Sequence, residues 1–517
     1  MKVGFVTSNA AFSQPIIDEL TRRGHDVCLY RHSPNEGENL WQLGQAAATV
    51  DRVFVDWAQP PLEQVLNNFN CPIFVRAHRL EMYSPEYLQS LPWNKVDCLF
   101  FIADHVRSRF CEALQAAQPR RVVVLSHVGI DGSFWKPDPV LRKWEPPWKI
   151  VIAGNIVPKK RLYTAVQLLR DLPEDFALTI RGSSTMPGYG NLEYAQNVTD
   201  LIMDLGLMKR VDADQSDAAK TGREVYQRSH FVLSASNEEG CHTAVAEGMA
   251  CGCVPLVNTW RGADKVYPPE WVWRSPKEFY SLCEDWVAFP PERKQGLSDA
   301  MRDFVLPKYE AAAIASTVCD YVTGPVDAES IGEWYSANML EHMAEQDGNL
   351  RQQQAYEALK PYLQPGAKTL EIGCGTGWLS RQLAAEGYAA YGQDVALKLL
   401  EWADAHNPAG AVFEQGDATK ALIKGPFDLI TAIDVLEHIR TENHPELLVR
   451  IAHELRPGGH LVCRFPARIS DKQIVEEKVF PKVLRKQCQE AGLQVVAFGP
   501  TGDLYFEVIA RKPEVAL

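Results

Sequence analysis

Short apolar runs rich in β-branched and aromatic residues alternate with amphipathic, helix-length segments along the whole chain. This alternation is typical of βα units, in which helices cover a mostly parallel sheet. The runs fall into three sets that begin near Val3, Lys149 and Lys368. A Pro- and Trp-rich stretch (133–149) separates the first two sets, and a Gly- and Pro-containing acidic stretch (322–330) precedes the third. The sequence therefore predicts an α/β protein, with domains at 1–146, 147–322 and 333–517 and a linker at 323–332.

The composition excludes several classes of protein. A net charge of -13 argues against sequence-independent binding of nucleic acid, which needs a basic surface. The N-terminus lacks the pattern of a signal peptide, and no apolar run approaches the ~18 residues of a membrane span. The 12 cysteines show neither the spacing of a disulfide framework nor that of a zinc site. We expect a cytoplasmic protein with reduced thiols and no bound metal.

The third set opens with a glycine-rich turn. In TLEIGCGTG, Glu371 lies at the end of a predicted strand and Gly373, Gly375 and Gly377 follow it. Glycines at this point let the backbone turn sharply and approach a ligand just before a helix begins. Asp394 ends the next predicted strand, where its carboxylate can accept hydrogen bonds from both ribose hydroxyls. Dinucleotide-binding folds share such a turn, and a tight turn without any ligand is the alternative.

The residues that follow distinguish these alternatives. GDA (416–418), DVLEH (434–438) and the turn PGG (457–459) occur in this order. Together with the glycine turn, they resemble the class I S-adenosylmethionine methyltransferases from about residue 333 onward. The resemblance implies that Gly373 and Gly375 hold the methionine part, that Asp394 holds the ribose and that Asp417 with Ala418 meets the adenine. The predicted cofactor-binding set is Glu371, Gly373, Gly375, Gly377, Asp394, Asp417, Ala418 and Asp434.

A histidine is the candidate base of this predicted methyltransferase. Methyl transfer depends mostly on the orientation of the acceptor, and a hydroxyl acceptor also benefits from a base. His438 follows the cofactor motifs, and an imidazole suits this work near neutral pH. A packing or capping role for His438 is the alternative, and His444 and His460 are weaker candidates.

The second set contains two glutamates on either side of a predicted helix start. Glu239 follows the strand-like run 230–236, a helix begins near His242, and Glu247 lies on its second turn. A carboxylate on the entering loop can bind sugar hydroxyls, and one on the helix can bind a nucleotide ribose. The free N–H groups at the helix N-terminus suit a diphosphate. This stretch therefore predicts a nucleotide-sugar site.

The spacing of these glutamates and the surrounding EGMACGCVPLV resemble the retaining GT-B glycosyltransferases of family 4. The resemblance implies two Rossmann-like domains with the donor held by the second, and Lys160 matches the family's lysine. Asn155 stands where the family has an arginine, and Arg161 or Arg181 is a candidate to compensate. His78 matches a histidine that faces the donor sugar, although a histidine at a strand end is the alternative. The predicted catalytic residues are Glu239, His78 and His438, and the nucleotide-sugar set is Asn155, Lys160, Arg161, His242, Thr243 and Glu247.

The segment 211–214 reads VDAD and contains a DxD triplet. In GT-A glycosyltransferases such a triplet binds a metal. Here a helical run follows, so capping of that helix is the favoured interpretation.

The two resemblances together predict a bifunctional enzyme of glycan or glycoconjugate assembly. It transfers a sugar from a nucleotide-sugar donor to a saccharide or glycoconjugate and methylates a hydroxyl, or an amine, of the product with S-adenosylmethionine. A methyltransferase with a degenerate sugar-binding module is the alternative, and a natural-product enzyme is a further one. A lipid-linked acceptor would add peripheral membrane contact, and the sequence carries no signal for the oligomeric state.

Overall fold

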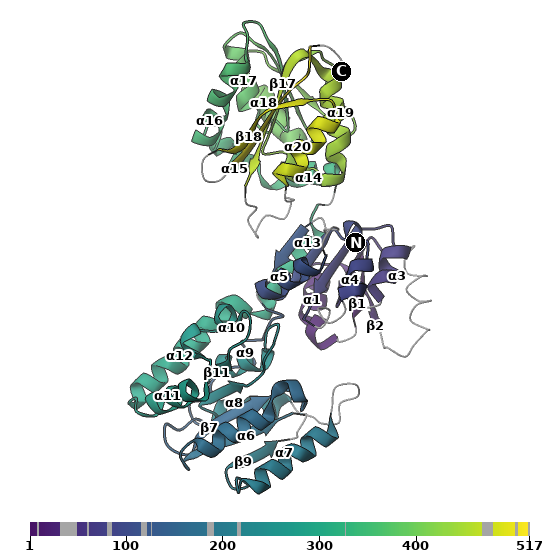
Figure 1. Cartoon of the computed structure of the whole chain (residues 1–517). Helices are drawn as coiled ribbons and strands as arrows, with labels where there is room; N and C mark the ends of the chain where they lie inside the picture. The colour runs from purple at the N-terminus through teal and green to yellow at the C-terminus, as the bar shows by residue number, and fades with distance from the viewer. Residues whose placement is uncertain are drawn as a thin grey trace. The chain divides into compact units, whose positions relative to one another are not determined.

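The computed structural model describes residues 1–7, 10–31, 49–58, 61–79, 85–114, 121–125, 127–182, 191–214, 219–325, 327–467, 479–501 and 505–514. The chain forms two compact units. Unit 1 comprises Met1–Pro92, Leu99–Gln118 and Val122–Val322, and unit 2 comprises Trp93–Cys98, Pro119–Arg121 and Thr323–Leu517. Both units are α/β structures built on sheets with helices packed against them, which confirms the predicted fold class (Figure 1).

The first sheet of unit 1 has the strand order β2-β1-β3-β4-β5-β6. Its strands are β1 (Lys2–Thr7), β2 (Asp26–Arg31), β3 (Arg52–Asp56), β4 (Ile73–Ala77), β5 (Cys98–Phe101) and β6 (Arg121–Val124). The helices are α1 (Ala10–Arg22), α3 (Pro61–Asn68), α4 (Pro85–Ser90) and α5 (Asp104–Leu114). Strand β1, next to the edge strand β2, pairs in parallel with β2 and β3. Strands β4 and β5 are buried along their whole length, as expected for a sheet with both faces covered.

The second sheet of unit 1 is parallel throughout, in the order β12-β11-β10-β7-β8-β9. Its strands are β7 (Trp148–Ala153), β8 (Phe176–Arg181), β9 (Val211–Asp214), β10 (Phe231–Ser234), β11 (Val254–Asn258) and β12 (Val272–Trp273). The helices are α6 (Leu162–Asp171), α7 (Leu192–Asp204), α8 (Ala219–Arg228), α9 (Thr243–Ala250), α10 (Ala263–Val266), α11 (Pro276–Val287) and α12 (Pro291–Tyr309). One continuous apolar core, from Ile130 to Tyr309, supports this sheet.

The VDAD segment is a strand and not a helix cap, so the capping interpretation was wrong. Val211–Asp214 forms the edge strand β9, which pairs in parallel with β8. Helix α8 begins later, at Ala219. Edge strands tolerate polar residues because one of their sides is not paired.

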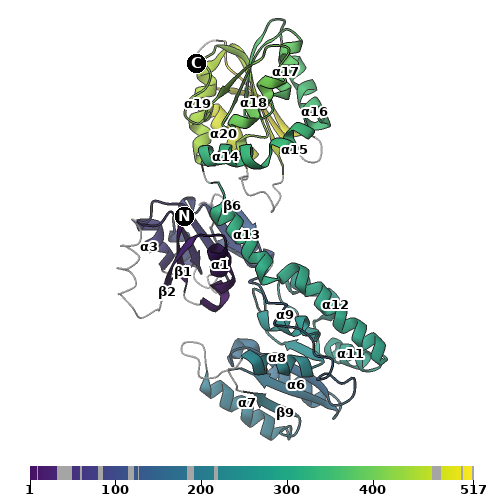
Figure 2. The ribbon, with the colours of Figure 1, turned by 180° about the vertical axis from the view of Figure 1, so that it is seen from behind.

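The last helix of unit 1 returns to the first sheet. Helix α13 (Ala311–Thr323) follows α12 in sequence but lies beside α1, as Figure 2 shows. Its Asp320 accepts a hydrogen bond from Arg23 (2.6 Å), and the ring of Tyr321 packs edge-on against Phe100. Arg52 donates to the carbonyl oxygen of Val322 (2.6 Å). The first sheet is therefore covered by a helix from the far end of unit 1.

Unit 2 contains a seven-stranded sheet in the order β15-β14-β13-β16-β17-β19-β18. The strands are β13 (Lys368–Ile372), β14 (Ala389–Asp394), β15 (Val412–Gln415), β16 (Phe427–Ile433), β17 (Leu455–Pro466), β18 (Gln494–Thr501) and β19 (Tyr505–Arg511). The helices are α14 (Ala328–Asn338), α15 (Leu340–Glu345), α16 (Leu350–Leu359), α17 (Trp378–Ala385), α18 (Leu397–Ala405), α19 (His444–Glu454) and α20 (Pro481–Glu490). Among these strands, β19 pairs in antiparallel fashion with both β17 and β18, and the other pairs are parallel.

Two separate apolar cores cover the two faces of this sheet. Helices α16 and α17 contribute Leu359 and Leu379 to one core, and α19 and α20 contribute Ile451 and Leu484 to the other. The PGG turn lies within β17 and not in a loop before it, since that strand already begins at Leu455. Among the described helices, none has both the length and the apolar character needed to cross a lipid bilayer.

Candidate functional sites

The first candidate site lies where β10 leads into α9. The loop after β10 carries Glu239, and His242 occupies the N-cap position of α9. His242 is fixed by its own hydrogen bonds, since its Nδ1 lies 2.9 Å from the hydroxyl oxygen of Ser234. The structure therefore places a carboxylate and an imidazole beside the free N–H groups of a helix N-terminus, where anions bind readily.

A lysine from a different loop completes this arrangement. Lys160 ends the 3-10 turn after β7, and its Nζ donates to Oε1 of Glu239 over 2.6 Å. The same Nζ lies 2.9 Å from Nε2 of His242. The hydroxyl of Ser236 also donates to Glu239 (2.8 Å). Lys160 thus contacts both the predicted catalytic residue Glu239 and His242 of the predicted nucleotide-sugar set.

Charges in this cluster control the protonation of its members. Burial favours the neutral form of Glu239, but the neighbouring His242 and Lys160 lower its pKa well below the usual range. Burial and the adjacent Lys160 lower the pKa of His242 to about 4. At neutral pH the cluster therefore contains an ionised Glu239 carboxylate and a neutral His242 imidazole.

Two glycines allow the strand ends around Lys160 to approach each other. Gly154 has a φ of 134°, and a Cβ atom there would lie 3.3 Å from Cε of Lys160. A Cβ atom on Gly182 would lie 1.9 Å from the carbonyl oxygen of Gly154. A side chain at Gly182 would therefore collide with the backbone of Gly154. Glycine at this position lets the ends of β7 and β8 lie close together, which brings the loop of Lys160 next to α9.

The other members of the predicted nucleotide-sugar set have different surroundings. Asn155 lies in the loop after β7, partly buried, and Thr243 is the first residue of α9. Arg161 has a left-handed backbone (φ 54°) and donates to Oδ1 of Asn237 over 2.6 Å. Glu247 contacts the hydroxyl of Tyr226 over 3.4 Å. Burial raises the pKa of Glu247 to about 7, with Arg181 acting in the opposite direction.

The raised pKa of Glu247 predicts a pH-dependent stability effect. The folded protein holds this proton more tightly than an unfolded chain with a pKa of about 4.3 does, so the stability contribution of Glu247 falls as pH rises from about 4 to 7. Glu247→Gln should therefore raise the free energy of unfolding by about 3–4 kcal/mol near pH 8, and have little effect near pH 4.5. Differential scanning calorimetry at both pH values measures this difference. The exposed Glu270→Gln should change nothing at either pH, and an equal effect of Glu247→Gln at both would contradict the assignment.

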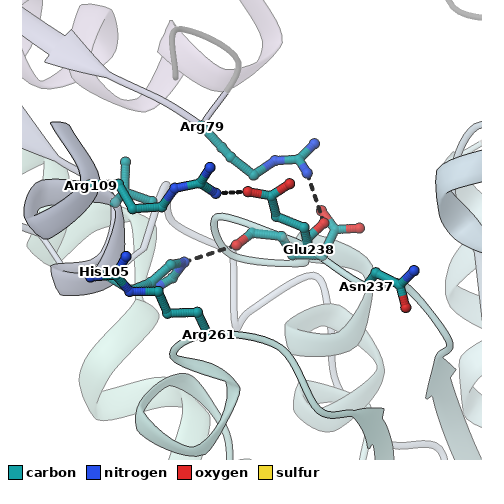
Figure 3. Close-up of a pocket in the computed structure, with 8 residues that line it drawn as sticks. Arg79, His105, Arg109, Asn237, Glu238 and Arg261 are labelled. Carbon is teal, nitrogen blue, oxygen red and sulfur yellow. Dashed lines mark hydrogen bonds and ion pairs between the residues drawn. The ribbon is translucent and has the colours of Figure 1, made fainter. Parts of the chain in front are cut away.

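Residues of the first sheet domain face the same loop across a cavity of about 220 Å³ (Figure 3). Arg79 donates to the carbonyl oxygen of Glu238 (2.7 Å), and Nε2 of His105 lies 2.8 Å from the carbonyl oxygen of Glu239. Arg109 forms an ion pair with the Glu238 side chain. Burial lowers the pKa of His105, so its neutral ring donates this hydrogen bond. Arg79, His105 and Arg109 were absent from the predicted site. Two signals pointed to them: Arg79 directly follows His78 in the sequence, and the i,i+4 spacing of His105 and Arg109 places both on one face of α5.

His78 belongs to a buried network within the first sheet domain. Its Nε2 lies 2.8 Å from Oδ1 of Asp56, and its ring stacks on Trp57 with centroids 3.8 Å apart. Arg76 also donates to Asp56, from Nε over 2.8 Å. His78 is not among the residues that line the cavity of Figure 3. The carboxylate of Asp56 thus fixes the orientation of the imidazole.

The second candidate site lies at the carboxyl ends of β13 and β14. Gly373, Gly375 and Gly377 have φ values of 67°, 53° and 70°. A Cβ atom on Gly373 would lie 2.3 Å from Cγ2 of Val435, so this position requires glycine. Asp394 ends β14, and its Oδ2 accepts a hydrogen bond from the Gly375 backbone (2.8 Å). The glycine turn and the predicted ribose ligand are therefore in contact.

The remaining predicted cofactor residues lie around this turn. Glu371 accepts hydrogen bonds from the backbone (3.0 Å) and hydroxyl (2.6 Å) of Ser380, which joins the end of β13 to α17. Asp417 follows β15 and accepts a hydrogen bond from the Thr419 backbone (2.9 Å), and the adjacent Ala418 is buried. Asp434 directly follows β16, has a φ of 53° and pairs with Arg351 of α16 over 3.2 Å.

The three histidines proposed for methyl transfer occupy different environments. Nε2 of His438 lies 3.2 Å from the Tyr335 hydroxyl of α14. His444 is buried, and its Nε2 contacts the carbonyl oxygens of Leu436 and Ile439 (both 3.0 Å), which fixes the DVLEH turn. His460 lies on β17 beside the ring of Tyr362. Of these three histidines, His438 is the one that lies within a predicted cofactor motif and has a hydroxyl group as its partner.

Helices before the third sheet cover the glycine turn. Asp347, between α15 and α16, accepts hydrogen bonds from Thr376 (2.9 Å) and Arg381 (2.6 Å). A Cβ atom on Gly375 would lie 2.6 Å from Cε of Met343 in α15. These contacts place the segment before β13 over the predicted cofactor site, a role that its sequence did not indicate.

Comparisons with known proteins match these two sites. Residues 134–267 match the family Glycosyl transferases group 1, and residues 339–497 match the family Methyltransferase domain. A sucrose-phosphate synthase structure from Thermosynechococcus elongatus is similar, with a TM-score of 0.53, 14% identity and coverage of 62% of this chain and 98% of its own. The structure of Anabaena HepE with UDP and glucose has a TM-score of 0.51, 13% identity and coverage of 63% and 100%. At such identities the likeness concerns the fold alone.

Curated relatives resemble a smaller part of the chain. Trans-aconitate 2-methyltransferase from Deinococcus radiodurans is 37% identical over 105 residues, which are 20% of this chain and 39% of the relative. Ubiquinone biosynthesis O-methyltransferase from Cupriavidus pinatubonensis is 36% identical over 102 residues, 19% of this chain and 40% of the relative. The chain thus spans about two fifths of the length of these relatives. The methyltransferase domain implies S-adenosylmethionine as methyl donor, and the glycosyltransferase domain implies a nucleotide-sugar donor. The chain contains a Glycosyl transferases group 1 domain with a GT-B fold followed by a methyltransferase domain.

Proposed function

We propose that this protein is a bifunctional enzyme of glycan or glycoconjugate assembly that works in the cytoplasm. Unit 1 transfers a sugar from a nucleotide-sugar donor with retention of configuration, as in family 4, and unit 2 methylates a hydroxyl of the glycan product. The contact of Lys160 with Glu239 and His242 at the N-terminus of α9 supports this proposal most strongly. Covalent linkage would keep a shared product near both sites at a high effective concentration.

For sugar transfer, the residues around α9 would divide the donor among them. The N–H groups at the start of α9 and the Lys160 ammonium would hold the diphosphate. Glu247 would hold the ribose, and Glu239 would accept hydrogen bonds from the sugar hydroxyls. Because Lys160 keeps Glu239 ionised, this carboxylate is an acceptor throughout the neutral pH range. Asn155 contributes no charge here, and Arg161 is already bonded to Asn237.

For methyl transfer, unit 2 would hold its cofactor at the glycine turn. The residues fit this group, since the turn lacks side chains where the backbone must approach a ligand and Asp394 ends the neighbouring strand. S-adenosylmethionine, when bound, supplies an electrophilic methyl group. His438 would accept the proton of the acceptor hydroxyl, with Tyr335 fixing the orientation of its ring.

Two observations favour a second function for unit 1, that of a sugar-binding module that only delivers substrate. Asn155 replaces an expected cation, and the Arg161 side chain that could compensate is engaged with Asn237. In this case unit 1 would bind a nucleotide sugar or glycan without consuming it.

Thermal shift with a panel of nucleotide sugars and with S-adenosylmethionine tests both sites, because a ligand that binds only the folded state raises the Tm. Both responses are expected, together with release of nucleoside diphosphate when a saccharide acceptor is added. NMR of the product should show the donor's anomeric configuration. Binding without release under every acceptor condition would support the delivery module. The absence of any nucleotide-sugar response would refute sugar transfer by unit 1, and the absence of a response to glycans as well would refute the delivery module.

A further inference from the structure

A cluster of polar side chains lies at the carboxyl ends of β16 and β17 and the start of β19, and we call it the acceptor-edge cluster. Its members are Arg351, Asp434, Arg464, Tyr505 and Glu507. Arg351 pairs with Asp434 (3.2 Å) and donates to the Tyr505 hydroxyl (3.1 Å). The Arg464 guanidinium lies 4.8 Å from the centroid of the Tyr505 ring. Arg464 and Glu507 are opposite each other in the antiparallel pairing of β17 and β19.

Several polar atoms of this cluster are buried without a hydrogen-bond partner among the described residues. They are Oδ1 of Asp434, Nε of Arg464 and Oε2 of Glu507. Arg464 is only 4% exposed. Burial raises the pKa of both Asp434 and Glu507, which shows that their surroundings do not solvate the charged form well. Unsatisfied buried polar groups cost free energy, so their concentration at one place points to a ligand that satisfies them.

The cluster lies next to the predicted cofactor turn. Asp434 directly precedes Val435, whose side chain fills the space above Gly373. The Asp434 backbone N–H donates to the carbonyl oxygen of Arg464 (2.8 Å), which joins the ends of β16 and β17. In open α/β sheets ligands bind outside the carboxyl ends of the strands. A ligand on this cluster is therefore well placed to receive a methyl group.

The chemistry of the cluster selects one class of ligand. Two arginines and two carboxylates give no net charge but offer hydrogen-bond donors and acceptors side by side. An acidic ligand would meet Asp434 and Glu507, and an apolar ring would leave the buried polar atoms unsatisfied. The hydroxyl groups of a sugar both donate and accept, so they complement this arrangement.

We propose that the acceptor-edge cluster binds a neutral, polyhydroxylated methyl acceptor, with Asp434 and Glu507 accepting hydrogen bonds from its hydroxyl groups and Arg464 donating to it. This proposal rests on the methyltransferase function proposed for unit 2 and specifies its substrate class. It also assigns Asp434 to the acceptor and not to the cofactor.

The test uses the full-length protein and three probes: methyl α-D-mannopyranoside as a neutral glycoside, D-glucuronic acid as an acidic sugar and catechol as a phenol. Binding is measured by saturation-transfer difference NMR in the presence of S-adenosylhomocysteine, and turnover by formation of S-adenosylhomocysteine from S-adenosylmethionine. The neutral glycoside should bind and be methylated with the lowest KM. Glu507→Gln and Arg464→Gln should each raise that KM at least tenfold and weaken the NMR signal. The Kd for S-adenosylmethionine should stay within twofold, measured by calorimetry.

Glu490→Gln is the matched control, since Glu490 is exposed at the end of α20 and its substitution should leave KM unchanged. A cofactor Kd close to that of the wild type shows that a variant is folded. If Arg464→Gln misfolds, Glu507→Gln still tests the proposal, because glutamine has nearly the same shape as glutamate. A lower KM for the acidic or phenolic probe, no binding of the glycoside, or an unchanged KM in both folded variants would overturn the proposal. Failure of the proposed function itself looks different. The protein would then not bind S-adenosylmethionine. Binding of the glycoside to the wild type, and weaker binding to Glu507→Gln, would still support the acceptor-edge cluster as a glycoside site.

Discussion

Glu239→Gln is expected to lower the rate of nucleoside diphosphate release from the nucleotide-sugar donor by about 10²- to 10³-fold. The substitution keeps the shape of the side chain and its contact with Ser236, but it removes the charge that pairs with Lys160. The amide would accept weaker hydrogen bonds from the sugar, and Lys160 would lose its ionic partner. Methyl transfer by unit 2 should keep its wild-type rate, which provides an internal measure of folding.

The matched control for this experiment is Glu270→Gln, an exposed carboxylate in the same sheet domain. Its rate of diphosphate release should equal that of the wild type. The loss of a buried ionic partner can destabilise a protein by about 3–5 kcal/mol, so the Tm of each variant is measured beside the rate. A folded Glu239→Gln variant with an unchanged rate would remove Glu239 from the proposed sugar site.

Asp394→Ala is expected to weaken binding of S-adenosylmethionine by about 100-fold, as measured by isothermal titration calorimetry. Each hydrogen bond to a charged group contributes about 1.5–3 kcal/mol. Because about 1.4 kcal/mol corresponds to a tenfold change in affinity, loss of about 3 kcal/mol from the ribose contacts weakens binding about 100-fold. The variant also loses the acceptor that holds the backbone N–H of Gly375 at 2.8 Å, so the glycine turn becomes less ordered. Both effects act in the same direction.

Glu401→Ala serves as the control for Asp394→Ala, because Glu401 is exposed on α18, the helix that follows Asp394. Its affinity for the cofactor should match that of the wild type, and neither substitution should change diphosphate release by unit 1. Equal affinity of wild type and Asp394→Ala would show that the ribose is held elsewhere.

Much of the fold follows from local sequence patterns. The apolar runs of the sheets, such as 73–77 and 427–433, are long, buried and bounded by polar residues, so their periodicity is clear. Two of the edge strands, β9 (VDAD) and β15 (VFEQ), lacked this signal, because an edge strand is partly solvated and tolerates acidic residues. The glycine turn and its partner Asp394 were predictable because they belong to consecutive βα units.

The rest of the sites depends on contacts between distant parts of the chain. Arg79 and His105 reach the loop of Glu239 from another sheet domain, and a single sequence carries no information on which strand ends face each other. Glu371 is a predicted cofactor residue, and the sequence did not indicate that its carboxylate accepts a hydrogen bond from Ser380 in the first turn of α17. Such partners depend on the distance between strand and helix, which packing determines.

The return of α13 to the first sheet has a practical consequence for dissecting this protein. Val318, Cys319 and Val322 of this helix are fully buried, and Arg23 and Arg52 bond to its C-terminal half. In an N-terminal fragment that ends in the stretch 133–149, the surface that packs on these apolar side chains would be exposed, and Arg23 and Arg52 would lose their contacts with α13. Co-expression of the two halves should rescue each, since residues 311–323 then complement the N-terminal fragment in trans, as a strand or helix does in a split protein.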